Sequence, residues 1–183
     1  MKEDLVVLFS GGADSMLLLE MAKEMGRKPY ALIMDYEQLH KEEIGFAIEY
    51  CMNNRLMYQV VGIQGLNVNS ALTGDGTKGK FDGVSIWNVP GRNTMFLSVA
   101  FSVAENKDIQ EIWYGPDYSD REGLFPDCYQ DYVYRVNQLF EVAGVKPIKV
   151  YAPLMGMTKE MILKLLELKG ITKQKMFSGY GNL

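Results

Sequence analysis

The stretch Ser10-Gly-Gly-Ala-Asp-Ser15 decides the fold of this chain. It follows the apolar run 5–9, whose length and β-branched residues are typical of a buried strand, and it precedes a helical pattern over 16–25 that a glycine closes. Two adjacent glycines at a turn from strand to helix let backbone N–H groups approach a ligand closely, and the start of the helix adds partial positive charge. The hydroxyls of Ser10 and Ser15 add further donors. The stretch therefore predicts a turn that binds phosphate.

This turn differs from two familiar phosphate-binding motifs. No lysine follows the glycines, as the Gly-x-x-x-x-Gly-Lys-Ser/Thr loop requires, and the glycine spacing is not Gly-x-Gly-x-x-Gly. The pattern Ser-Gly-Gly-x-Asp-Ser resembles the PP-loop of the ATP pyrophosphatases, which split ATP between its α- and β-phosphates and transfer AMP to a carbonyl oxygen. The alternative is a plain Gly-Gly turn in which Asp14 caps the helix.

The composition limits the class of protein. The chain has 183 residues, 48% of them hydrophobic and 23% charged, so we expect a single PP-loop domain over residues 1–183. The net charge of −4 argues against a protein that holds nucleic acid mainly through phosphate contacts. Two distant cysteines, Cys51 and Cys128, indicate no disulfide framework, and no run reaches membrane-spanning length. We expect a cytoplasmic protein with no membrane partner and no stable nucleic-acid partner.

Further apolar runs alternate with helical patterns along the chain. Runs that predict four more strands lie at 30–34, 57–61, 112–115 and 148–150. Helical spacing predicts helices at about 41–54, 94–104, 127–143 and 159–169. This alternation is typical of a parallel α/β sheet. We expect the helix at 94–104 to be buried, because it is apolar nearly all round.

Polar residues follow the predicted strands. The segment 64–90 is rich in Gly, Asn, Asp and Lys and too long for a simple connector, so we expect a mobile lid or binding loop there. Ligands of a parallel sheet bind beyond the carboxyl ends of its strands. The polar clusters expected at this rim lie at 10–15, 35–40 and 115–127, with Arg92 and Lys159. Their convergence predicts one composite site.

Four further stretches match one family of PP-loop enzymes. They are Asp-Tyr-Glu-Gln-Leu-His-Lys-Glu-Glu-Ile at 35–44, Val-Pro-Gly-Arg-Asn at 89–93, Phe-Pro-Asp-Cys at 125–128, and Ala-Pro-Leu-Met at 152–155 with Lys159. In this order they make the chain resemble the 7-cyano-7-deazaguanine (preQ0) synthase family, formerly called ExsB. The resemblance implies a Rossmann-like, adenine nucleotide alpha hydrolase-like fold: five parallel strands with helices on both faces. It also implies ATP-dependent conversion of 7-carboxy-7-deazaguanine and ammonia to the 7-nitrile, through adenylation and an amide intermediate, with release of AMP and pyrophosphate.

The resemblance assigns several residues to ATP. Those expected to bind the nucleotide are Ser10, Gly11, Gly12, Ala13, Asp14, Ser15 and Asp35. Asp14 is expected to help place Mg²⁺ beside the ATP phosphates, and Lys159 is the candidate for a second phosphate contact. The predicted catalytic residues are Asp14, Arg92 and Lys159. For Lys159 the alternative is a surface lysine at a helix start, and for Arg92 it is a structural salt bridge.

Other residues are candidates for the substrate. Arg92, with Asn93 beside it, is placed to bind a carboxylate or phosphate bidentately. Asp117 and Asp127 are candidates to accept hydrogen bonds from the guanine-like face of the base, and loop capping is the alternative for both. His40, the only histidine, is a candidate for proton transfer, with a polar helix-entry residue as the alternative. Cys128 is interpreted as a packing residue, since no activating base for it is identified.

The chain departs from the family in two places. Members usually carry a C-terminal four-cysteine zinc site, which two cysteines and one histidine cannot build, so we expect no zinc. Glu37 stands where the family usually has Gly. The alternatives are a PP-loop adenylating enzyme that stops at the 7-amide or acts on another acid or a tRNA base, and a degenerate nucleotide-binding subunit. The expected partners are the small-molecule substrates, and a homodimer is left open.

Overall fold

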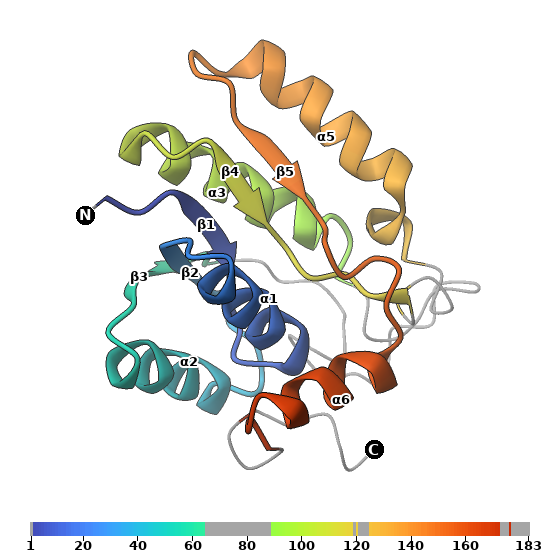
Figure 1. Cartoon of the computed structure of the whole chain (residues 1–183). Coiled ribbons are helices and arrows are strands. Elements are labelled where there is room, and N and C mark those ends of the chain that lie inside the picture. Colours follow the sequence, from blue (N-terminus) through green and yellow to red (C-terminus); the bar gives the residue numbers. More distant parts are fainter. Residues whose placement is uncertain (1, 65–88, 119, 121–124, 173–175, 177–183) are drawn as a thin grey trace.

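A computed structural model describes residues 2–64, 89–118, 120, 125–172 and 176 (Figure 1). It contains a sheet of five parallel strands. The strands are β1 (Leu5–Leu8), β2 (Pro29–Asp35), β3 (Met57–Gly62), β4 (Glu111–Trp113) and β5 (Lys149–Tyr151). Their order is β3-β2-β1-β4-β5, so the chain winds from β1 to one edge and then from β4 to the other. The five strands and their parallel arrangement confirm the prediction.

Helices cover both faces of the sheet, as predicted. One face carries α1 (Ala13–Glu24), α2 (Glu42–Asn53) and α6 (Lys159–Leu168). The other carries α3 (Arg92–Lys107) and α5 (Gln130–Ala143), which a short 3-10 helix, η1 (Pro126–Cys128), precedes. The fully buried side chains of β1 alternate between these layers, because Leu5 and Val7 pack toward α1 and α6 while Val6 packs toward α3 and α5.

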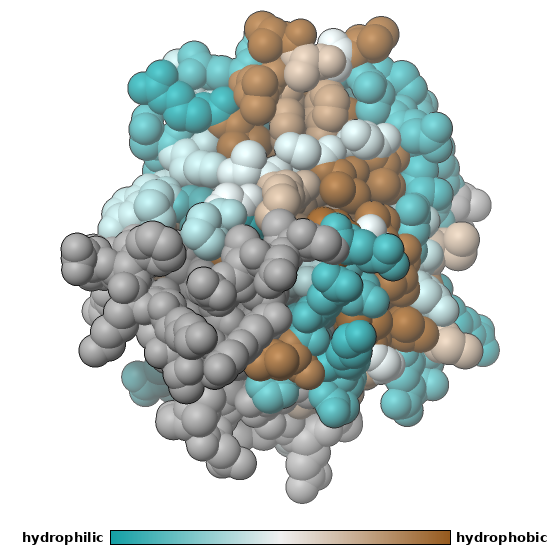
Figure 2. All heavy atoms as spheres, turned by 180° about the vertical axis from the view of Figure 1, so that it is seen from behind, coloured by the Kyte–Doolittle hydropathy of each residue, from teal (hydrophilic) through white to brown (hydrophobic). Residues whose placement is uncertain are grey.

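Helix α3 is less buried than its sequence predicts. Its buried side chains are Leu97, Ala100 and Ala104. Thr94, Ser98 and Ser102 recur every fourth residue and are exposed, and both serines donate hydrogen bonds to carbonyls one turn back. This polar stripe makes the helix amphipathic, so the prediction of a wholly buried helix is wrong. Figure 2 shows the reverse of the molecule, where hydrophilic and apolar side chains share the surface.

Two further expectations concern the limits of the fold. The segment 64–90, predicted as a mobile loop, lies outside the described residues apart from its ends. Within the described ranges, no helix combines the length and the apolar character that crossing a membrane requires.

Candidate functional site

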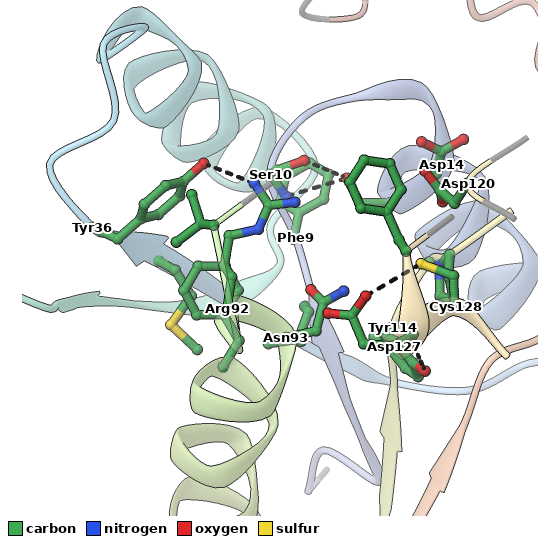
Figure 3. A pocket seen from close by; sticks show the side chains of 18 of the residues that line it. Phe9, Ser10, Asp14, Tyr36, Arg92, Asn93, Tyr114, Asp120, Asp127 and Cys128 are labelled. Carbon is green, nitrogen blue, oxygen red and sulfur yellow. Dashed lines mark hydrogen bonds between the residues drawn. The ribbon is translucent and has the colours of Figure 1, made fainter. Parts of the chain in front are cut away.

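A cavity of about 570 Å³ opens beyond the carboxyl ends of β1, β2 and β4. Its walls come from the segments that follow these strands, from the start of α3 and from η1 (Figure 3). The winding direction of the sheet reverses between β1 and β4, which is where a parallel sheet leaves a crevice for ligands. Its polar lining includes Ser10, Asp14, Ser15, Arg92, Asp120 and Asp127, and Asp120 lies beside Asp14 (Figure 3).

Two serine hydroxyls hold the turn between β1 and α1 in shape. Ser15 Oγ accepts a hydrogen bond from the backbone N–H of Ser10 at 3.2 Å and donates one to the carbonyl oxygen of Gly12 at 3.1 Å. Ser10 Oγ accepts from the backbone N–H of Gly12 at 3.3 Å. The turn is thus cross-linked by its own side chains, and both serines line the cavity.

Gly11 is required by the geometry of the turn. Gly11 has a φ of +85°, and a Cβ atom there would lie 2.8 Å from Phe46 Cδ1. Gly12 is the N-cap of α1 and has no side chain to accept hydrogen bonds from the first turn of the helix. The N–H groups at the positive end of α1 therefore suit an anionic ligand.

A charged cluster joins this turn to two other segments. Lys159 Nζ lies 2.6 Å from each carboxylate oxygen of Asp14 and 3.0 Å from Asp117 Oδ2. Burial raises the pKa of Asp14 to about 6, although Lys159 opposes the rise. Burial by itself lowers the pKa of Lys159, but the two carboxylates outweigh it and hold that pKa above its usual value. The Lys159 side chain therefore carries a positive charge at neutral pH.

Arg92 opens α3 and directs its side chain toward the cavity (Figure 3). Its Nη1 donates a hydrogen bond to Tyr36 Oη at 3.4 Å, and the guanidinium carbon lies 5.8 Å from the centre of the same ring. Within the described parts of the chain, Arg92 forms no ion pair. The remaining N–H donors of the Arg92 guanidinium suit an anion that binds bidentately. Asn93 lines the cavity beside it.

The opposite wall is acidic and aromatic. Tyr114 Oη donates to the backbone carbonyl oxygen of Asp127 at 3.1 Å, and the Cys128 thiol donates to Asp127 Oδ1 at 3.7 Å. Burial raises the pKa of Asp120. It also raises the pKa of the Cys128 thiol, which disfavours the thiolate and supports the interpretation of Cys128 as a packing residue. The carboxylates at this wall are acceptors for the N–H groups of a ligand.

Seven predicted site residues do not line the cavity: Gly11, Gly12, Ala13, Asp35, His40, Asp117 and Lys159. Asp35 Oδ1 accepts a hydrogen bond from the backbone N–H of Glu37 at 3.2 Å, and so stabilises the turn after β2. His40 lies at the entry to α2, outside the lining residues. Asp117 is 1% exposed and faces Lys159. The functional roles of all the predicted site residues stay predictions.

Tyr36 and Asp120 are among the polar lining residues that the sequence prediction did not include. Tyr36 follows β2 directly, and Asp120 belongs to the polar segment after β4. Both positions lie beyond the carboxyl end of a strand, and that position was the available signal. Residue type alone did not separate Asp120 from its neighbour Asp117.

With this geometry in view, comparison with known proteins identifies the family. The model of the family described as queuosine biosynthesis protein QueC matches residues 4–182. The chain belongs to this family. It is therefore a synthase-type enzyme of the ATP-dependent ligase class, as the PP-loop and the ordered motifs indicated.

Proteins named 7-cyano-7-deazaguanine synthase resemble this QueC-family chain over most of its length. The one from Alteromonas mediterranea is 34% identical over 170 residues, which cover 89% of this chain and 78% of that protein. The one from a Cyanothece species is 34% identical over 195 residues, covering 97% of this chain and 84% of its relative.

Solved structures with the same fold are more distant. The U34-tRNA thiolase NcsA from Methanococcus maripaludis has a TM-score of 0.62 at 14% identity, covering 99% of this chain and 61% of that one. The NH3-dependent NAD synthetase from Campylobacter jejuni has a TM-score of 0.58 at 18% identity, covering 96% and 67%. These similarities confirm the Rossmann-like, adenine nucleotide alpha hydrolase-like fold and concern the fold alone.

Proposed function

We propose that this chain converts 7-carboxy-7-deazaguanine and ammonia into 7-cyano-7-deazaguanine at the expense of ATP. In the first half of the reaction, the carboxylate attacks the α-phosphate of ATP and releases pyrophosphate. Ammonia then displaces AMP from the acyl adenylate to give the 7-amide. In the second half, the amide oxygen is adenylated in the same way, and loss of AMP and a proton leaves the nitrile.

One observation carries the proposal. A PP-loop turn, a guanidinium and an acidic wall line the same cavity, which supports the proposal that a nucleotide and an acid bind there side by side. The relatives named 7-cyano-7-deazaguanine synthase support the choice of the acid.

The phosphate end of the cavity suits ATP and Mg²⁺. We assign the phosphates to the serine hydroxyls and the backbone N–H groups at the start of α1, with Lys159 as a further cation beside them. Among the described residues, no group of three or more His, Cys, Asp and Glu is placed to hold a metal ion. The carboxylate of Asp14 at the cavity fits Mg²⁺, which takes one or two protein carboxylates together with substrate phosphates. When bound, the metal neutralises charge on the phosphates.

The remaining walls suit a flat, polar-edged base. Leu32, Met34 and Phe96 give the cavity an apolar side against which a planar ring can lie. Asp127 offers a carboxylate acceptor for the amino and ring N–H groups of a guanine-like edge. Arg92 and Asn93 are assigned to the acid group of the substrate, which needs a cation until adenylation removes its charge.

We also propose the setting in which this reaction takes place. Cys51 and Cys128 are both buried thiols, which is compatible with the reducing cytoplasm expected from the sequence. The proposed unit is a single PP-loop domain over residues 1–183, whose partners are the two small-molecule substrates. A homodimer is tested by light scattering of the purified protein.

The decisive experiment measures products. Purified protein with MgATP, 7-carboxy-7-deazaguanine and ammonium is expected to form AMP and pyrophosphate, and omission of the acid is expected to stop their formation. Mass analysis of the base then separates nitrile from amide. Formation of ADP in place of AMP, or AMP formation that ignores the acid, contradicts the proposal.

Asp14→Asn tests the nucleotide end of the cavity. We expect AMP formation to fall by about 10²–10³-fold, because the change removes the carboxylate next to the transferring phosphates. Asp108→Asn is the matched control, since Asp108 is likewise a lysine-paired carboxylate but lies at the end of α3. It is expected to retain wild-type turnover. Full turnover by Asp14→Asn excludes the assigned role.

A further inference from the structure

The ammonium of Lys159 lies between two carboxylates that differ in solvent exposure. Asp14 lines the cavity and its side chain is 28% exposed. Asp117 is 1% exposed and does not line the cavity. Lys159 contacts both, at 2.6 Å and 3.0 Å. The lysine therefore has one partner that a ligand can reach and one partner that the protein encloses.

The enclosed carboxylate is held by its own loop. Asp117 Oδ1 accepts a hydrogen bond from the backbone N–H of Asp120 at 3.3 Å. In return, Asp120 Oδ2 accepts from the backbone N–H of Asp117 at 2.9 Å. This reciprocal pair fixes the carboxylate plane and leaves Oδ2 directed at Lys159. A carboxylate so enclosed is poorly placed to accept hydrogen bonds from a base in the cavity.

The backbone brings the partners of Lys159 together. Thr158 caps α6 by accepting a hydrogen bond from the N–H of Met161, so Lys159 is the first residue of that helix. The N–H of Tyr118 donates to the carbonyl oxygen of Met157 at 2.8 Å and ties the loop after β4 to the start of α6. A lysine at the positive end of a helix is unfavourable by itself, so its neighbouring carboxylates offset a real cost.

We propose that Asp117 is a positioning residue for Lys159. Its buried carboxylate keeps the ammonium beside the PP-loop turn when ATP arrives and Asp14 exchanges Lys159 for the nucleotide and its metal. Lys159 is then presented to the phosphates at a fixed place rather than swinging into solvent. This inference rests on the proposed function only in assigning ATP to the turn. It assigns Asp117 to the support of Lys159 in place of the predicted hydrogen bond to the guanine-like face of the base.

The test compares ATP affinity in a double-mutant cycle. Calorimetric titration with MgATP uses the wild type, Asp117→Asn, Lys159→Met and the double variant. Asparagine keeps the Oδ1 acceptor for Asp120 but removes the charge that faces Lys159. We expect each single variant to bind ATP about tenfold or more weakly, and we expect the double variant to match Lys159→Met. Asp108→Asn, which neutralises a lysine-paired carboxylate far from the cavity, is expected to bind ATP like the wild type.

Each other outcome overturns the inference. Wild-type ATP affinity in Asp117→Asn means that Lys159 needs no such partner. Additive losses in the double variant mean that Asp117 acts independently of Lys159. A rise in KM for 7-carboxy-7-deazaguanine, with ATP affinity unchanged, returns Asp117 to the base-reading role.

Two further readouts keep the test decisive. In Lys159→Met the buried carboxylate loses its cation, so adding Asp117→Asn is expected to raise the melting temperature. If Asp117→Asn fails to fold by itself, the comparison of Lys159→Met with the double variant still decides: equal ATP affinity supports the inference, and a further loss overturns it. Wild-type protein that does not bind ATP overturns both this inference and the proposed function. Wild-type protein that binds ATP but forms no AMP overturns the proposed reaction alone.

Discussion

Arg92 carries a permanent charge at the wall of the cavity, and its hydrogen-bond partner there is the neutral phenol of Tyr36. An arginine elsewhere in the fold behaves differently: Arg27 pairs with Asp4 and Glu111, which bind the start of β1 to the start of β4. The contrast separates an arginine that the protein satisfies internally from one that keeps its donors for a ligand.

Replacing Arg92 tests this reading at the residue scale. In Arg92→Ala we expect KM for the acid substrate to rise by about 10–100-fold while the affinity for ATP changes less than threefold, because a charge-assisted bidentate contact is lost. Arg92→Lys is expected to recover only part of the loss, since a point charge cannot bind bidentately. The measurement is steady-state kinetics with each substrate varied in turn. Equal losses toward the acid and ATP contradict the assignment.

At the scale of secondary-structure elements, Gly115 lets the segment after β4 pass close to the first turn of α1. A Cβ atom on Gly115 would lie 3.3 Å from both Asp14 Cβ and Leu18 Cδ1. The leucine side chain can yield, but Asp14 is held by the helix backbone. The close approach of these two elements brings Asp14 and the segment that carries Asp117 to a common lysine.

Gly115→Ala is expected to disturb this approach. The added methyl group must push Asp14 or the loop aside, so we expect the free energy of unfolding to fall by about 1–2 kcal/mol and ATP to bind more weakly. Gly45→Ala is the matched control, because its Cβ atom meets open space on α2 and is expected to stabilise by about 0.5–1 kcal/mol. Urea denaturation and calorimetry measure both quantities. If Gly115→Ala is stabilised like Gly45→Ala, the segment after β4 has room for a methyl group beside α1, and the prediction is wrong.

At the scale of the whole molecule, the fold brings several carboxylates close together at the cavity. Asp14 and Asp120 have pKa values that burial raises, and Asp14 is further disfavoured as an anion by Asp117 and Asp120. A folded state that raises a carboxyl pKa binds more protons than the unfolded chain, so its stability falls as the pH rises through that pKa. The raised pKa values of Asp14 and Asp120 therefore lower the free energy of unfolding of the protein at neutral pH.

The pH dependence of stability tests this cost. The pKa of Asp14 rises from an ordinary value near 3.8 to about 6 in the folded chain. Its contribution is present below about pH 4 and is lost as the pH rises to about 6 and beyond. Without nucleotide or Mg²⁺, the wild type is expected to lose about 1–3 kcal/mol relative to Asp14→Asn between pH 4 and pH 7. Urea denaturation at a series of pH values measures the difference. Parallel curves for the two proteins rule out the shift.

Local patterns in the sequence were enough for the framework. Strands follow from continuous apolar runs and helices from apolar residues at helical spacing, and the phosphate-binding turn follows from adjacent glycines between a strand and a helix. Because parallel strands bring their carboxyl ends to one edge, the approximate place of the site was also predictable. The amphipathic character of α3 was missed, although its Thr and Ser residues recur at a helical interval.

The sequence by itself determined the parallel sheet, the turn and the family, because each depends on residues that are neighbours along the chain. Only the tertiary structure decided that Asp117 faces Lys159, that Asp120 lines the cavity in its place, and that Arg92 has no ion pair within the described residues. These pairings join segments that are distant in sequence, and they depend on which way each side chain points after its strand ends. Repeating patterns carry no record of that direction, since packing between elements sets it.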